Sequence, residues 1–181
     1  MADVSVRLAS VQDASAIAAV QASSWKDALG GTLPPAVLDQ LRDAEAIEQW
    51  RRAVLDPPTA RHRLLVALAG TDVVGFAAIG PADDPDSDPL TDAELLAVGV
   101  LPERAREGHG SRLVNASIDY LRDDGFMRAQ VWLADTDRNL RDFLEAAGWA
   151  DDGARRRLDL RGDGDVLVDQ LRLNASIRDT A

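Results

Sequence analysis

Two glycines flanking a histidine stand where an apolar run gives way to an amphipathic one. Gly108, His109 and Gly110 follow the segment AELLAVGVLPERARE, and Ser111 opens a helical pattern. Glycines let a backbone approach a phosphate closely, and the free N–H groups of a helix N-terminus point at such an anion. The stretch therefore predicts a phosphate-binding turn, although a lone G-x-G is explained equally well as a plain strand-to-helix turn.

Three other readings of glycines and acids fail on spacing. A dinucleotide fingerprint needs Gly or Ala three positions beyond the second glycine, where Leu113 stands, and the G-K-[ST] of a P-loop is absent. In the acidic stretch 84–88, a calcium loop would need glycine at Pro89 and glutamate at Leu95. Neither a dinucleotide site nor a calcium loop is expected.

The charge balance restricts the partners. The chain has 31 Asp and Glu against 20 Lys and Arg, a net charge of −11; 25 of the acids are Asp, and Lys26 is the only lysine. Such a surface repels phosphate backbones, so nucleic acid is not an expected partner and cationic ones are favoured. Without cysteine, and with only His62 and His109, no metal site is expected.

The chain has 181 residues, which fits one domain over 1–181. The N-terminus MADVSVRLAS has no basic region followed by an apolar run, and no apolar stretch reaches membrane-spanning length. We therefore expect a cytoplasmic protein that makes no use of a membrane.

Apolar periodicity predicts an alternation of strands and helices. Strands are expected at 4–8, 63–69, 72–80, 93–100, 127–134, 154–160 and 166–173. Helical segments are expected after Ser10, across 34–57 with a break near Asp43, from about 108 to 125, and over 140–147; the acidic stretch 81–92 is one long loop. The predicted class is α+β with one strand-helix-strand crossover.

This order of elements, with three blocks at ordinary spacing, resembles the GNAT family, the GCN5-related N-acetyltransferases. The blocks are VGVLPERAREGHGSRLV, WLADTDRNLRDFLEAAGW and, as in small-molecule acetyltransferases of the group, ASSWKDALGGTLPP. The resemblance covers nearly the whole chain. It implies a mixed, mostly antiparallel, splayed sheet of about seven strands with about four helices, and acetyl-CoA bound between the fourth and fifth strands.

The same resemblance assigns roles residue by residue. Backbone groups of Val98, Gly99 and Val100 would pair with the pantetheine arm, and one N–H there would stabilise the thioester oxyanion. Glu94, at the start of the fourth strand, is the expected base, directly or through water. The pyrophosphate would be wrapped by Arg106, Glu107, Gly108, His109, Gly110 and Ser111, with Arg104 as an extra cation.

Three positions depart from the family pattern. Ala105 replaces the usual Arg or Gln, Asp137 an asparagine, and Leu144 the tyrosine that protonates the departing thiolate. The acids Glu107 and Asp137 also stand near the place expected for a polyanionic cofactor. These departures leave open a non-catalytic binding or regulatory module with the same fold, and a different acyl donor is a third reading.

Four further features have two readings each. Trp25 either lines the acceptor pocket or packs in the core, and Asp27 binds an acceptor ammonium or is a solvated acid, the simpler reading. Tyr120 is expected to pack, and the loop 81–92 to be solvated rather than a lid over a cationic acceptor.

The expected activity is transfer of acetyl from acetyl-CoA to a primary amine of a small molecule or peptide by direct attack. A homodimer is compatible with the sequence.

Overall fold

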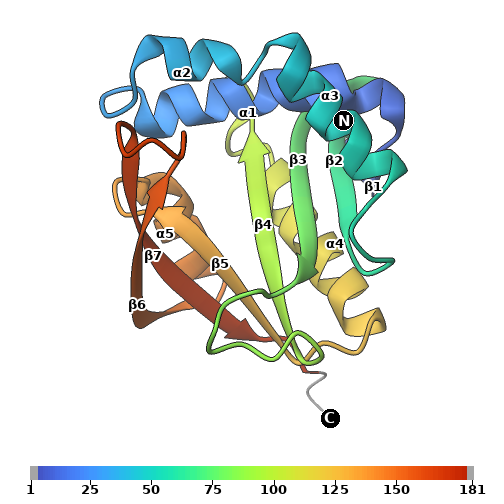
Figure 1. Ribbon diagram of the computed structural model, residues 1–181. Coiled ribbons are helices and arrows are strands. Elements are labelled where there is room, and N and C mark those ends of the chain that lie inside the picture. The colour runs from blue at the N-terminus through green and yellow to red at the C-terminus, as the bar shows by residue number, and fades with distance from the viewer. Residues whose placement is uncertain (1–3, 179–181) are drawn as a thin grey trace.

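Seven strands form one twisted sheet in the computed structural model, which describes residues 4–178 (Figure 1). Their order is β1-β2-β3-β4-β5-β7-β6, and only β4 and β5 run parallel. This confirms the predicted fold class. The strands are β1 (Val4–Leu8), β2 (Arg63–Ala69), β3 (Asp72–Pro81), β4 (Asp92–Val100), β5 (Arg128–Ala134), β6 (Ala150–Asp159) and β7 (Leu167–Ser176).

The β2–β3 hairpin forms as its two-residue connection predicts. Ala69 pairs with Asp72, and Gly70 between them has φ 63°, a conformation that favours glycine. Leu65 and Ala67 face one side of the sheet while Leu64 and Val66 face the other, and all four are buried. Both faces of this hairpin are therefore covered.

Five α-helices accompany the sheet, one more than expected. The extra helix arises because the second helical region is interrupted before Asp43, whose side chain caps the next helix by accepting the N–H of Ala46 at 2.9 Å. The helices are α1 (Ala14–Leu29), α2 (Pro35–Gln40), α3 (Ala44–Leu55), α4 (His109–Asp123) and α5 (Arg138–Ala146), with 3-10 turns at Val11–Asp13 and Pro102–Arg104.

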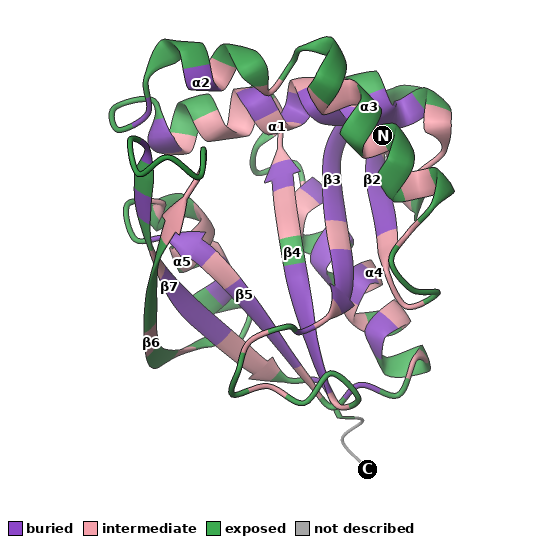
Figure 2. Ribbon diagram, in the orientation of Figure 1, coloured by how far each residue is buried: buried purple, intermediate pink, exposed green. Residues whose placement is uncertain are grey.

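The helices cover the sheet from both sides. Ile17 and Val20 of α1, with Trp50 of α3, pack against Phe76 on one face of β3. On the other face, α4 and α5 pack on the largest core cluster, which includes Leu113 (Figures 1 and 2). Within residues 4–178, no helix has the length and apolarity that crossing a membrane would require.

The sheet divides between β4 and β5. The two strands pair only from Asp92 to Glu94 on β4, opposite Arg128 to Gln130 on β5, and then separate (Figure 1). A register shift between Ala78 and Ile79 of β3 marks a bulge in the β3–β4 ladder just beyond the last pair. The separation leaves the second half of β4 without a neighbour on its β5 side.

The last two strands are longer than predicted. β6 begins at Ala150 rather than 154, and β7 ends at Ser176 rather than 173. The sequence of Asp151, Asp152 and Gly153 is typical of a turn, and the two carboxylates do bond the N–H groups of Gly153 and Ala154. Here, however, that turn is a bulge inside the β6–β7 ladder rather than its end.

The acidic loop between β3 and β4 is held in place, so the expectation of plain solvation is wrong for part of it. Asp84 accepts hydrogen bonds from Gln130 and Trp132, and only 14% of its side chain is exposed. Asp86 makes a two-pronged ion pair with Arg172. The loop is therefore anchored on β5 and β7.

Candidate active site

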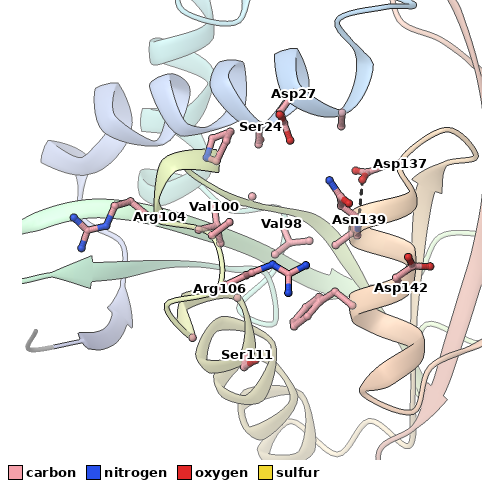
Figure 3. A pocket seen from close by; sticks show the side chains of 18 residues that line it. Ser24, Asp27, Val98, Val100, Arg104, Arg106, Ser111, Asp137, Asn139 and Asp142 are labelled. Atoms are coloured by element: carbon pink, nitrogen blue, oxygen red, sulfur yellow. Dashed lines mark hydrogen bonds between the residues drawn. The ribbon is translucent and has the colours of Figure 1, made fainter. Parts of the chain in front are cut away.

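A cavity of about 630 Å³ lies where β4 and β5 have separated (Figure 3). The end of α1, the end of β4, the loop before α4 and the first turns of α5 enclose it. Its lining residues are Ser24, Asp27, Ala28, Val98, Gly99, Val100, Pro102, Arg104, Ala105, Arg106, Gly108, Gly110, Ser111, Asp137, Asn139, Leu140, Asp142 and Phe143. The glycine turn and the fourth strand thus meet in one place.

The backbone of β4 presents hydrogen-bonding groups to this gap. The N–H of Leu101 donates to the carbonyl of Val74 on β3 at 2.9 Å. Because successive residues of a strand face alternate sides, Gly99 also bonds toward β3, whereas Val98 and Val100 turn their N–H and C=O groups to the gap. Gly99 lines the cavity in another way, since a Cβ there would lie 2.8 Å from Ser24 Oγ.

The glycine turn has the backbone of an anion site. Gly108 has φ 87° and Arg106 φ 65°, the latter a left-handed conformation that a side chain makes costly. Within the described part of the chain, no hydrogen bond from the N–H groups of Gly108, Gly110 or Ser111 is found. These donors lie at the N-terminus of the 15-residue α4, where the helix dipole also favours an anion.

The side chains around the turn divide into two groups. Arg104 and Arg106 line the cavity, but Glu107 does not: its carboxylate accepts from Arg104 Nε at 2.9 Å and lies 3.3 Å from His109 Nε2. His109 is itself buried at 1% exposure, so its imidazole lies outside the cavity. Glu107 and His109 can therefore serve a phosphate only through their backbone, and the acid is turned away from it.

The opposite wall of the cavity is acidic. Asp27 comes from α1, Asp137 from the N-cap of α5, and Asp142 from α5 itself (Figure 3). Burial raises the pKa of Asp137, the hydrogen bond that it accepts from Leu140 N–H at 3.1 Å lowers it, and the charge of Asp27 raises it. Asp137 thus caps α5, while Asp27 is an exposed acid, as the simpler expectation has it, that also borders the cavity.

Glu94 lies on the last rung before the strands separate, outside the residues that line the cavity. Only 8% of it is exposed, and Gln130 Nε2 donates to its carboxylate at 3.3 Å. Burial raises the pKa of Glu94, and the Gln130 hydrogen bond partly opposes this. A carboxyl group whose proton affinity is raised toward neutral pH is suited to general-base work.

Sequence reasoning missed part of the lining. Ser24, Asn139 and Phe143 all line the cavity, and the only signal for Ser24 was its place in the helical segment expected after Ser10. Position 144, where the family usually has a tyrosine, holds a fully buried leucine and offers no hydroxyl to the cavity. Among the lining residues, the hydroxyl groups are those of Ser24 and Ser111.

Two aromatic residues have structural places. Trp25 packs on the cluster that contains Leu29 and Val37 and does not line the cavity. Tyr120 packs against the main core, with the Arg63 guanidinium 5.2 Å from its ring centre. The predicted packing role of Tyr120 is confirmed.

Comparison with known proteins agrees with this geometry. Residues 23–149 match the model of the acetyltransferase (GNAT) family. The chain belongs to the GNAT family. The predicted family membership is thereby confirmed. At the level of the family, so is the prediction of an acetyl-CoA-dependent N-acetyltransferase.

Individual relatives share less than a third of their residues with this chain. YuaI of Bacillus subtilis strain 168, described as an uncharacterized N-acetyltransferase, is 29% identical over 130 residues, which span 72% of this chain and 71% of YuaI. The PaiA N-acetyltransferase of Thermoplasma acidophilum, solved with coenzyme A, superposes with a TM-score of 0.77 at 16% identity, covering 96% of this GNAT protein and 99% of PaiA. YncA of Salmonella typhimurium, solved with acetyl-CoA, gives 0.69 at 18% identity, covering 99% and 96%.

Proposed function

We propose that this GNAT protein transfers the acetyl group of acetyl-CoA to a primary amine of a small molecule or peptide by direct attack. The observation that carries the proposal is the continuity of the cavity. It begins at the unbonded N–H groups of Gly108 and Gly110 and reaches the gap-facing backbone of Val98. A molecule with a pyrophosphate at one end and a thioester at the other suits both ends.

The chain's own groups supply the binding. N–H groups at the start of α4 hold the pyrophosphate, and Arg106, beside them, adds a cation. The pantetheine amides pair with Val98 and Val100, whose backbone groups face the gap. Gly99 and Ser111 complete the contacts, the first by leaving room and the second through its hydroxyl.

The chemical step needs little more than positioning, because the thioester is already activated. We assign Glu94 to accept a proton from the acceptor ammonium, through water because Glu94 lies outside the cavity lining, and the neutral amine that results attacks the thioester carbonyl. The N–H of Val98, which faces the gap, stabilises the oxyanion. With Leu144 buried, the thiolate is left to the hydroxyl of Ser24, which lies beside Gly99 and would turn to the thiolate from the carbonyl of Gln21, to which it donates at 3.1 Å.

Calorimetric titration with acetyl-CoA tests the cofactor site. A Cβ on Gly110 would lie 3.5 Å from Phe143 Cζ, an ordinary contact, so Gly110→Ala is the matched control that retains binding. Gly110→Leu places a larger side chain in the cavity and is expected to abolish the binding heat. Equal binding by both variants would mean that acetyl-CoA does not use this turn.

Release of free thiol in the presence of a panel of amines tests the transfer itself. The buried Leu144 and the capping role of Asp137 favour one other candidate, a binding or regulatory module that holds the cofactor without turnover. Acetyl-CoA binding with no thiol release on any amine would favour that module. Binding of another acyl-CoA in preference to acetyl-CoA would identify a different donor.

A further inference from the structure

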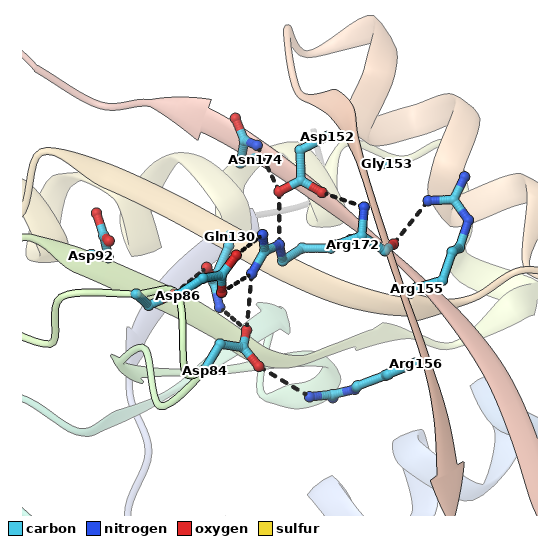
Figure 4. Close-up of polar contacts among 12 residues, drawn as sticks. Asp84, Asp86, Asp92, Gln130, Asp152, Gly153, Arg155, Arg156, Arg172 and Asn174 are labelled. Atoms are coloured by element: carbon cyan, nitrogen blue, oxygen red, sulfur yellow. Dashed lines mark hydrogen bonds and ion pairs between the residues drawn. The ribbon is translucent and has the colours of Figure 1, made fainter.

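The strand registers place two arginines, Arg172 and Arg156, on the sheet face that carries Glu94. The two have different surroundings (Figure 4). Arg172 on β7 donates to both oxygens of Asp86 at 2.7 and 2.6 Å and to Asp152 at 2.7 Å. Only 7% of its side chain is exposed. Its charge is fully paired, and its role is to anchor the acidic loop and the β6 bulge.

Arg156 on β6 is fixed but not saturated. Its Nε donates to Gln170 Oε1 at 2.7 Å, and its guanidinium lies 4.3 Å from the ring centre of Trp132. Its nearest carboxylate, Asp84, is 3.7 Å away, too far for a hydrogen bond. In the described chain, no residue accepts a hydrogen bond from its terminal nitrogens, and 37% of the side chain is exposed.

Asp84 is only partly engaged elsewhere. Its Oδ2 accepts from Gln130, from Trp132 Nε1 and, at 3.4 Å, from Arg172 Nη1, whereas its Oδ1 forms a long ion pair with Arg156 Nη1 at 3.7 Å. Burial lowers the pKa of Arg156, whereas the charges of Glu94 and Asp84 raise it. Arg156 is thus a planar cation, oriented by Trp132 and Gln170, whose terminal N–H groups remain available to an anion.

This cation borders the place where acetyl transfer is proposed. Trp132 follows Gln130 by two residues on β5, so both side chains stand on the same face. Gln130 is the partner of Glu94 on the last paired rung, and Trp132 lies beyond it, beside the gap. If Arg156 binds the anionic group of a small molecule, the atoms next to that group would therefore lie on the side of Glu94.

We propose that Arg156 binds a carboxylate of the acceptor, so that the substrate is a small amine that also carries a carboxylate, as an amino acid does. This inference rests on the proposed function. The excess of acids around the site attracts the ammonium group, while the oriented guanidinium takes up the carboxylate in a two-pronged pair. A polyamine would instead place a second cation against Arg156.

Matched acceptors provide the test with the full-length protein. L-phenylalanine is compared with phenethylamine, L-methionine with its decarboxylated amine, and spermidine serves as the polyamine. We expect kcat/KM to be about 10- to 100-fold higher for the carboxylate-bearing member of each pair, about what one charge-assisted hydrogen bond gives, because water partly screens this half-exposed pair. Arg156→Gln should remove this preference through KM and leave the plain amines within about twofold.

The control variant is Arg157→Gln, on the same strand and the opposite face, whose partner is Asp169. It should leave every rate unchanged. A second readout does not need turnover: binding of N-acetyl-L-phenylalanine to the coenzyme A complex, against N-acetylphenethylamine, measured by calorimetry.

The outcomes separate the two proposals. Turnover without a carboxylate preference, preference for spermidine, or an equal loss for acids and amines in Arg156→Gln would overturn the anion site and leave the transferase standing. Selective binding of the N-acetyl acid that Arg156→Gln abolishes, with no turnover of any amine, would support the anion site and overturn the transferase. Neither binding nor turnover would overturn both.

Discussion

Replacing Glu94 by glutamine should separate activity from stability. The side chain is buried at 8% exposure beside a single hydrogen bond from Gln130, so its ionised form is poorly solvated. Its pKa therefore lies above the ordinary 4.5, and the rate of the native enzyme should fall as pH drops through that raised value. In Glu94→Gln, thiol release at saturating acetyl-CoA should be about 100-fold slower than in the native enzyme. Its rate should no longer fall at acidic pH, the acidic limb of the native profile, while calorimetry gives unchanged cofactor binding.

The sign for stability is the opposite. Between pH 4.5 and its raised pKa, Glu94 holds more protons in the folded than in the unfolded state, so its contribution to stability declines as pH rises. Each tenfold increase in proton affinity corresponds to about 1.4 kcal/mol. Above the raised pKa, the melting temperature of Glu94→Gln should therefore exceed that of the native protein by about 2–4 °C for each kcal/mol of unfolding free energy regained. At pH 4 the two should melt together. Glu103→Gln, on the surface, is the control. An unchanged rate, or an acidic limb that persists in Glu94→Gln, would refute the assignment of the base.

Three smaller changes have defined outcomes. The Arg7 hydrogen bond lowers the pKa of Asp13 to about 2, so Asp13→Asn should cost about 1–2 kcal/mol in urea unfolding at pH 7, a difference that disappears as pH falls through 2. Leu144→Tyr restores the usual family residue at a fully buried position, so the melting temperature should drop without faster thiol release; a faster rate would contradict the buried position. Arg106→Gly relieves a φ of 65° and should stabilise the fold by about 1 kcal/mol in urea, whereas Arg106→Ala keeps the strain; calorimetry should give weaker acetyl-CoA binding for both.

Local patterns predicted most of the fold. Alternating and continuous apolar runs located β1 and β2 to the residue, because the alternation of β1 stops at Leu8 and the apolar run of β2 stops before Gly70. The glycine turn was found from Gly108 and Gly110 for the same reason, since left-handed and close-approach backbone is encoded locally.

Contacts between distant segments were out of reach. Nothing near Asp84 in the sequence indicates that Arg172, 88 positions away, will lie beside it, so the anchored loop was expected to be solvated. The direction of the Glu107 side chain depends on contact with the buried His109. In the last hairpin both strands were predicted, but the bulge at Asp151 concealed the start of β6. Side-chain direction and long-range pairing are set by packing, which a single sequence does not display.

The early separation of β4 from β5 gives the sheet an internal edge. Strand edges elsewhere invite pairing with foreign chains, but this one lines a cavity between α1 and α5 rather than the outer border of the sheet. The pantetheine arm would act there as a surrogate strand and connect two half-sheets that meet over only three rungs. Hydrogen exchange at the amides of Val98 and Val100 should therefore slow when cofactor binds, and β5 to β7 should gain protection with them.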